Sequence, residues 1–281
     1  MSMNILHLSC ERKSSGRGRA ATGKIGAWLR SAALCVMAMT AGTVLGGGAA
    51  SAQESWTVTA TPYLWLQGMT GDLKVHGVSA HVNDNFFDVL SKTDTVLGAF
   101  LHLDARQGPW GLYGEVDYAY TSVKDKKGPF DTRVRTSTTI LELGGMYRLL
   151  EGSVGQAGAP ERWRIEATAG VRYLSFNAKV DFGPLSADKT QSWVDPVIGL
   201  NGTVDLSEHW SLIGHADIAG FGVGSDFSTN LYALVGYRTT MFGANVLSTI
   251  GYRGLYINRS SGDNSVDLWM HGPALGLTFR F

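Results

Sequence analysis

Three features of the sequence predict an all-β fold, a transmembrane antiparallel up-and-down β-barrel. Apolar and polar residues alternate over stretches of ten or more residues, aromatic residues stand at both ends of these stretches, and the chain ends in phenylalanine. About 9–11 residues of a tilted strand cross a bilayer, whereas strands of soluble proteins usually have roughly five or six. We therefore expect about ten membrane-spanning strands, with eight or twelve as alternatives.

The first 52 residues predict an export signal. A basic stretch ends at Arg30, an Ala-rich apolar run follows, and Ala50-Ser51-Ala52 has the small-x-small pattern that signal peptidase accepts. We expect cleavage after Ala52, so that residues 53–281 form a single barrel domain in the outer membrane of a Gram-negative bacterium. A permanent N-terminal anchor is the alternative, but the apolar run is shorter than the ~20 residues of a membrane helix.

Composition argues against several classes of function. The formal net charge of the chain is zero, but residues 1–52 hold six basic residues and one acidic residue, so residues 53–281 carry a net charge of −5. Nucleic-acid binding needs clustered basic surface, so we expect no such partner. Both cysteines, Cys10 and Cys35, precede the predicted cleavage site. The barrel therefore has no disulfide and no thiolate ligand, and we predict no cofactor and no metal.

Alternation is clearest in the second half of the chain. Between residues 162 and 173, Ile165 and Val171 share one face, and Glu166 and Arg172 share the other, because successive side chains of a strand point to opposite faces. We expect the apolar faces to contact lipid and the polar faces to line the interior. Membrane interfaces favour Trp and Tyr, and such residues stand near the strand ends: Trp56, Trp110, Trp163, Trp210, Tyr120, Tyr173 and Tyr256.

The same pattern defines ten strands along the chain. They are expected at 56–67, 94–106, 110–122, 132–149, 162–178, 190–206, 209–221, 227–240, 243–256 and 266–281. Residues 71–82 also alternate, but an eleventh strand would place the chain ends on opposite sides, and bacterial barrels have even strand numbers. We therefore assign residues 68–93 to a long first extracellular loop with a short helix at 84–90. The turns at 107–109, 207–208 and 241–242 then face the periplasm.

The C-terminal segment carries a recognisable assembly signal. Leu275, Leu277, Phe279 and Phe281 lie on one face of the last strand. A final strand that ends in phenylalanine resembles the signal by which outer-membrane barrels are recognised for assembly. Phe281 therefore predicts the barrel assembly machinery as a partner, and outer-membrane lipids as the surroundings of the mature protein.

Charged residues of both signs occupy the polar faces of the strands. A charge that faces lipid at mid-depth costs ~2–4 kcal/mol, so these faces should point inward. The interior of a ten-stranded barrel is narrow, and we expect it to be filled by ion pairs or to leave a narrow pore for small solutes. The residues predicted to line it are Asp104, Glu115, Asp117, Glu142, Glu166, Arg172, Trp193, Asp195, Asp205, His215, Asp217, Arg238 and Arg253.

Two His-x-Asp pairs, His102 with Asp104 and His215 with Asp217, share faces of their strands. Such pairs serve acid–base chemistry or metal ligation in some proteins, and they are similar to the acid and histidine pairs of ten-stranded omptin proteases. His102 and Asp104 fall near the predicted periplasmic end, away from an external substrate. A hydrolase would need Ser211 and His215 in contact, but four residues of a strand span ~13 Å.

The segment Gly220-Phe-Gly-Val-Gly-Ser-Asp226 superficially resembles a phosphate-binding loop. It lacks the Lys-Ser/Thr pair of a P-loop and the strand-to-helix context of a dinucleotide site. A tight extracellular turn between two strands explains these glycines without a ligand.

Several segments resemble a widespread proteobacterial group of uncharacterised outer-membrane barrel proteins. They are Pro62-Tyr-Leu-Trp-Leu66 with Gly68 and Gly71-Asp72, residues 84–90, Asp195-Pro-Val-Ile-Gly199, residues 220–226, Gly251-Tyr-Arg253 and Gly272-Pro-Ala-Leu-Gly276. The resemblance covers essentially the whole mature chain. It implies a porin-like or OmpA-type barrel in the outer membrane, and it implies no catalytic residues.

We therefore predict a non-enzymatic outer-membrane barrel with a structural or narrow-pore role. One alternative is a membrane-embedded hydrolase of lipid or peptide. Another is an adhesion or binding protein that acts through the predicted extracellular loop, residues 68–93.

Overall fold

The computed structural model of the chain describes residues 55–75, 78–87, 95–127, 130–153, 162–182, 185–241 and 243–281. The chain divides into two units, Met1–Gln53 and Glu54–Phe281, and all described residues belong to the second. The predicted export signal lies outside the described residues and stays a prediction. Within those residues, no helix has the length and apolar character needed to cross a membrane.

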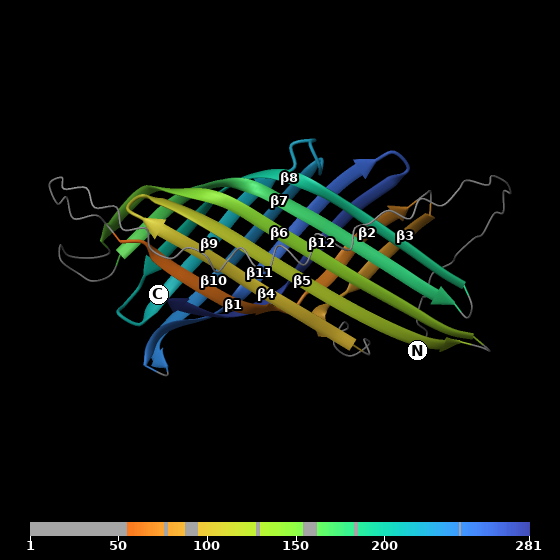
Figure 1. The fold of residues 1–281 in the computed structure, drawn as a ribbon, viewed down its shortest axis with the longest axis horizontal. Helices are drawn as coiled ribbons and strands as arrows, with labels where there is room; N and C mark the ends of the chain where they lie inside the picture. The colour runs from red at the N-terminus through yellow and green to blue at the C-terminus, as the bar shows by residue number, and fades with distance from the viewer. Residues whose placement is uncertain are drawn as a thin grey trace, which may run out of the picture. The chain divides into compact units, whose positions relative to one another are not determined.

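The described strands form one antiparallel sheet that closes on itself (Figure 1). Consecutive strands from β4 to β12 are neighbours, and β1 pairs with both β4 and β12, which closes a ring of ten strands. This ring confirms the predicted all-β barrel. The strands are β1 Thr57–Trp65, β2 Gly68–Val75, β3 Val78–Asp84, β4 Thr95–Gln107, β5 Trp110–Lys127, β6 Phe130–Ser153, β7 Arg162–Phe182, β8 Leu185–Asp205, β9 Trp210–Ala219, β10 Phe227–Met241, β11 Ala244–Ser261 and β12 Asn264–Arg280.

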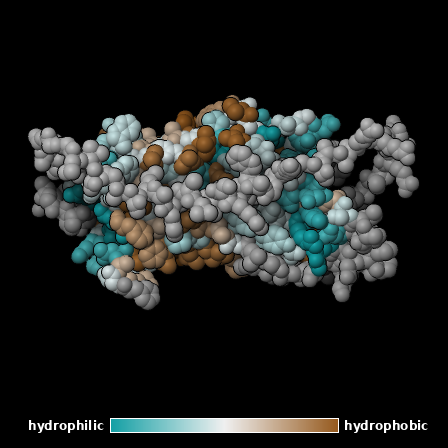
Figure 2. All heavy atoms as spheres, viewed as in Figure 1, coloured by the Kyte–Doolittle hydropathy of each residue, from teal (hydrophilic) through white to brown (hydrophobic). Residues whose placement is uncertain are grey.

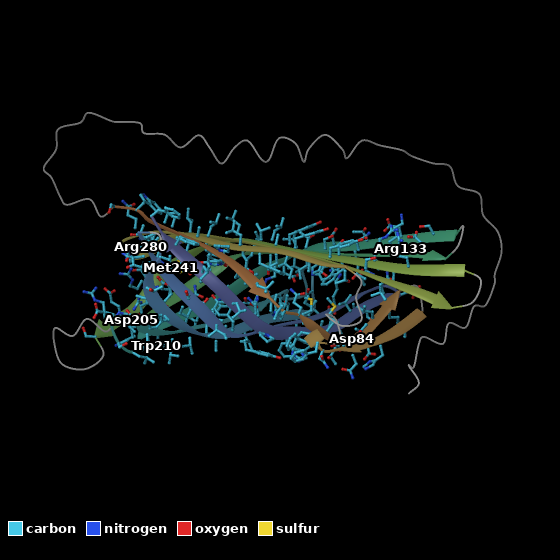
Figure 3. The ribbon with its side chains drawn as sticks, turned by 90° about the horizontal axis from the view of Figure 1, so that it is seen from below. Asp84, Arg133, Asp205, Trp210, Met241 and Arg280 are labelled. Atoms are coloured by element: carbon cyan, nitrogen blue, oxygen red, sulfur yellow. The ribbon has the colours of Figure 1, made fainter. Side chains whose placement is uncertain are left out.

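The two ends of the barrel differ. We call the end that holds Arg280 and Trp210 the base, and the opposite end, which holds Asp84 and Arg133, the rim (Figure 3). The connections described at the base are short, such as β4–β5, which Gly108 turns with a φ of 58°. The strands that extend farthest at the rim, β5 to β8, are 18 to 24 residues long in total. These strands exceed the ~9–11 residues that cross a bilayer, so they extend beyond it.

The β2–β3 hairpin corrects the loop predicted for residues 68–93. β2 continues the path of β1 and pairs with β12 from Gly68 opposite His271 to Lys74 opposite Ser265. β12 therefore pairs with β1 toward the base and with β2 toward the rim. Residues 68–75 and 78–84 therefore form a paired hairpin instead of a loop. The second neighbour of β2 is β3 and not β4, so the hairpin extends the sheet beside β12 without adding a strand to the ring of ten. Of the predicted helix, Phe86 and Phe87 are helical, and residues 88–90 lie outside the described residues.

Apolar side chains cover the outer face of the ring. Val171, Leu200 and Leu212 are 50%, 49% and 42% exposed, whereas Glu166 on the opposite face of β7 is 3% exposed. Figure 2 shows hydrophobic residues across the middle of the barrel and hydrophilic residues toward its ends. In a soluble sandwich the apolar faces would turn toward a shared core. The outer apolar band therefore faces lipid.

Aromatic residues limit this band on both sides. Toward the base, the rings of Trp210 and Tyr237 lie 4.9 Å apart. Toward the rim, the ring of Tyr256 lies 6.3 Å from Phe227 and 5.6 Å from Trp269. Phe227 and Tyr237 belong to the same strand, β10, and their spacing corresponds to roughly 25 Å across a membrane at the usual strand tilt. The band thus has the height of a bilayer core.

Candidate functional site

The strand register arranges the interior in rows that cross several strands. One row contains ionisable residues from five neighbouring strands: His102, Glu115, Glu142, Arg172 and Asp195. The adjacent row toward the rim is largely apolar: Phe100, Asp117, Ile140, Leu174 and Trp193. The polar and apolar parts of the interior therefore follow from register as well as from alternation.

Two arginines organise a buried layer of charge near the middle of the barrel. We define this charge layer as Glu115, Asp117, Glu142, Arg172, Asp217 and Arg253, all on interior faces. Glu115 and Glu142 lie directly opposite each other on β5 and β6. Two like charges in that position destabilise a strand pair. Each carboxylate therefore needs a cation, and one arginine contacts each of them.

Arg172, on β7, donates hydrogen bonds to residues of three other strands. Its Nε donates to Glu142 Oε2 at 2.7 Å, and its terminal nitrogens donate to Asp217 and, at 3.5 Å, to Ser228 Oγ. The side chain is only 1% exposed. Asp217 also accepts a hydrogen bond from the backbone N–H of Asn230 at 3.0 Å. A buried charge is tolerated only when it is paired and hydrogen-bonded in this way.

Arg253 forms the second half of the layer. It donates to Glu115 Oε1 at 2.6 Å and to the Tyr63 hydroxyl at 2.6 Å, and it lies 3.1 Å from Asp117 Oδ2. Tyr63 in turn donates to Asp117. The guanidinium also lies 4.4 Å from the ring of Trp65, a cation–π contact. Strands that are distant in sequence are therefore held together across the interior.

The two histidines of the His-x-Asp pairs lie beside this layer. His215 contacts Asp217 at 2.9 Å and Asn201 Oδ1 at 2.5 Å. His102 contacts Glu115 at 3.2 Å and lies 3.8 Å from Asp104. Among the described residues, no group of three or more His, Cys, Asp and Glu side chains could hold a metal ion. Their contacts make both histidines part of the interior polar network.

The Tyr113 side chain lies along the interior face of the barrel, over two glycines of β6 and β7. A Cβ atom on Gly144 would lie 2.6 Å from the Tyr113 ring, and one on Gly170 would lie 3.0 Å from its hydroxyl. The glycines therefore let the ring lie flat on the sheet, as aromatic side chains do over strand glycines. From this position the hydroxyl donates to Glu142 Oε1 at 2.9 Å.

A buried apolar cluster, which we call the apolar plug, lies on the rim side of the charge layer. We define it as Ile140, Leu174, Trp193, Leu255, Ile257 and Met270, which come from five strands and belong to one buried cluster. Leu174, Leu255, Ile257 and Met270 are each 0% exposed. Interiors packed this densely leave few voids as large as a water molecule. The plug therefore lies between most of the charge layer and the rim.

The Gly-rich segment after β9 folds inward over this plug. Gly220 and Gly222 have φ angles of 95° and 76°, which favour glycine. The turn brings Ser225 inside, where its N–H and Oγ donate to the two carboxylate oxygens of Asp195 at 2.6 and 2.7 Å. Trp193 Nε1 donates to Ser225 Oγ at 2.7 Å. The predicted tight turn is present, but its last residues pack against interior side chains.

A polar chamber occupies the base half of the barrel. Its volume is about 1130 Å³, and it extends to residues at the base itself, including Arg280. Its lining includes threonines on β1 and the ionisable residues His102, Asp104, Arg106, Arg164 and Glu166. A second cavity of about 10 Å³, enough for roughly one water molecule, lies between His102, Thr168 and His215. Neither cavity is lined by a residue of the apolar plug.

The remaining predicted lining residues lie in or beside the chamber. Arg106 contacts Asp104 at 2.7 Å and Glu166 at 3.2 Å. Arg238 contacts Asp205 at 2.5 Å, and Ser211 Oγ donates to the same carboxylate at 2.9 Å. Ser211 therefore donates its hydrogen bond to Asp205 instead of to His215, the partner that a hydrolase would need.

Sequence reasoning missed Tyr63, Tyr113, Ser225 and Asn230, which complete the polar network. Tyr63 lies on the same face of β1 as the chamber threonines, so alternation alone could have indicated it. Tyr113 could have been inferred only with the register that sets it against two glycines. The inward position of Ser225 has no local signal in the sequence.

A closed antiparallel barrel with an outer apolar band, aromatic borders and a charged interior defines this chain as a transmembrane β-barrel, the architecture of outer-membrane proteins. No protein-family model matches the chain, and no curated protein matches it. Similar solved structures include three outer-membrane proteins. The attachment invasion locus protein Ail of Yersinia pestis is 11% identical, with a TM-score of 0.32 over 81% of this chain and 99% of its own.

The outer-membrane protease OmpT of Escherichia coli is also 11% identical, with a TM-score of 0.41 over 81% of this chain and 94% of its own. OprG of Pseudomonas aeruginosa is 13% identical, with a TM-score of 0.32 over 82% of this chain and 97% of its own. Similarity at this level assigns no activity to the chain.

Proposed function

We propose that this chain is a non-enzymatic protein of the bacterial outer membrane whose barrel is closed to solutes and has a structural role. The observation that carries the proposal is the buried apolar plug next to the charge layer. Solutes and ions cross a barrel through a water-filled path. Leu174 and Leu255, both 0% exposed, stand where that path would run.

The base faces the periplasm in this proposal. Outer-membrane barrels have short periplasmic turns and longer extracellular connections. The short described turns and Phe281 at the base, and the extended strands β5 to β8 at the rim, support this orientation. The chamber then admits small solutes from the periplasm as far as the charge layer. Phe281 remains our candidate for recognition by the assembly machinery.

Conductance in planar lipid bilayers tests the proposal. The wild-type protein, with insertion verified by heat-modifiable mobility on gels, is expected to give no stable conductance steps. The double variant L174A/L255A truncates two plug residues and should produce steps, while L212A makes the same truncation on the lipid-facing surface and should stay silent. Discrete ohmic channels from the wild-type protein would refute the closed barrel and favour the narrow pore.

A further inference from the structure

The rim-side ends of β5 to β8 form a four-stranded sheet beyond the membrane. We call it the rim sheet, residues 121–127, 130–137, 177–182 and 185–191. Its outer face is continuous with the lipid-facing surface, because every second residue of a strand lies on the same face. On β6 this face runs from Leu143 and Leu141, 66% and 40% exposed, to Arg135 and Arg133. Figure 3 places Arg133 at the rim.

The register gathers cations on this outer face. Arg135 lies directly opposite Lys179, and Arg133 lies opposite Asp181. Like charges directly across a strand pair destabilise it. The sequence nevertheless places them together in a barrel domain whose net charge is −5.

Two carboxylates lie among these cations, Asp181 and Asp188, and Asp188 lies directly opposite Lys179. Arg135 contacts Asp181 Oδ2 at 3.0 Å. The hydrogen bond from Ser186, followed by the positive charges of Arg135, Lys179 and Arg133, lowers the pKa of the Asp181 carboxyl. Asp181 therefore lies within electrostatic reach of three cations, which we call the basic cluster: Arg133, Arg135 and Lys179. The nearby Asp188 accepts a hydrogen bond from Asn177 at 2.6 Å.

We propose that the basic cluster binds the phosphates of a glycolipid headgroup in the outer leaflet. Guanidinium groups bind phosphate oxygens through paired hydrogen bonds. The acyl chains of the same lipid would lie against the apolar outer face of β6 and β7 below the cluster. This assignment rests on the membrane placement and orientation proposed above.

The height of the cluster selects a glycolipid over a phospholipid. From Thr139, which lies opposite the exposed Tyr118, the strand advances roughly 13 Å to Arg135 and roughly 20 Å to Arg133, or about 10 and 15 Å along the membrane normal at a tilt near 40°. The headgroup region of a phospholipid leaflet is only ~5–8 Å deep. A phosphorylated saccharide extends farther from the acyl chains than a phospholipid headgroup does, so it suits a cluster at this height.

Binding to purified protein in detergent micelles tests the assignment. The probes are a rough-type lipopolysaccharide with a phosphorylated core, the same material after chemical dephosphorylation, and phosphatidylglycerol. The wild-type protein should bind the phosphorylated form at least tenfold more tightly than either of the others. Equal affinity for all three probes would overturn the assignment.

Three variants locate the site on the outer face. R135Q/K179Q should weaken binding about tenfold. K189Q removes one positive charge from the opposite face of the rim sheet, where Lys189 is exposed and pairs with Ala178, and should bind as wild type. D181N removes a competing carboxylate and should tighten binding, a change that damage to the fold would not produce.

Wild-type affinity in R135Q/K179Q, or an equal loss in K189Q, would overturn the proposed site. These measurements in detergent do not depend on whether the barrel conducts or which way it faces. A failure here is therefore distinct from a failure of the closed-barrel proposal.

Discussion

Replacement of Arg172 by Met removes the cation that two buried carboxylates share. Met keeps much of the length of the side chain but none of its hydrogen bonds. Glu142 would retain only the Tyr113 hydroxyl, at 2.9 Å, among the partners that the structure gives it. Asp217 would retain His215 at 2.9 Å and the Asn230 N–H at 3.0 Å. Both carboxylates would remain buried.

The cost follows from this burial. Removal of one partner from a buried ion pair typically destabilises a protein by about 3–5 kcal/mol, because the remaining charge is left uncompensated. Arg148 provides a control at the mouth of the polar chamber, since it is 27% exposed and its partner Glu151 is 60% exposed. An exposed pair contributes at most about 1 kcal/mol. R172M should therefore lower the free energy of unfolding several times more than R148M.

Urea unfolding of protein refolded into lipid vesicles, followed by tryptophan fluorescence, measures both variants. The triple variant E142Q/R172M/D217N should recover part of the loss, because it also neutralises the two carboxylates that R172M leaves without their cation. If R172M and R148M unfold at the same urea concentration, the charge layer does not stabilise the barrel and our reasoning about its energetics fails.

Four further predictions test other parts of the barrel. V171R places a charge in the lipid-facing band and should cost about 2–4 kcal/mol of unfolding free energy, and an unchanged urea midpoint would argue against lipid contact. I257A should cost about 2–5 kcal/mol in the same assay by leaving a cavity in the plug; a loss below 1 kcal/mol would indicate loose packing. D195A frees Ser225, so added protease should cleave residues 220–226 faster than in wild type, and equal rates would show that the contact does not hold the segment. Deletion of Phe281 should reduce the heat-modifiable fraction in cells while refolding in vitro persists, and normal assembly in cells would contradict its role as a signal.

Much of the interior was predictable from alternation. Glu166 and Arg172 were assigned to the interior because they share a face opposite Ile165 and Val171, and both are buried, at 3% and 1% exposure. Pairing partners were not predictable in the same way. The contact between Arg253 and Glu115 joins residues 138 positions apart, and only the number of strands and their stagger decide that the two meet.

The β2–β3 hairpin illustrates the same limit. Residues 71–82 alternate like the strands of the wall, but alternation cannot show which neighbour a strand takes. In the structure, the rim half of β12 pairs with β2, and its base half pairs with β1. The inward fold of residues 220–226 likewise depends on Asp195, which lies on a different strand.

By itself, the sequence determined which side chains face lipid and which face the interior, because that choice depends only on the two-residue period of a strand and on the cost of exposing charge to hydrocarbon. The tertiary structure decided that the charges form a compact layer and that buried apolar side chains from five strands gather on its rim side. Those outcomes depend on cross-strand register and closure, which bring distant residues together and are set by the whole sheet at once.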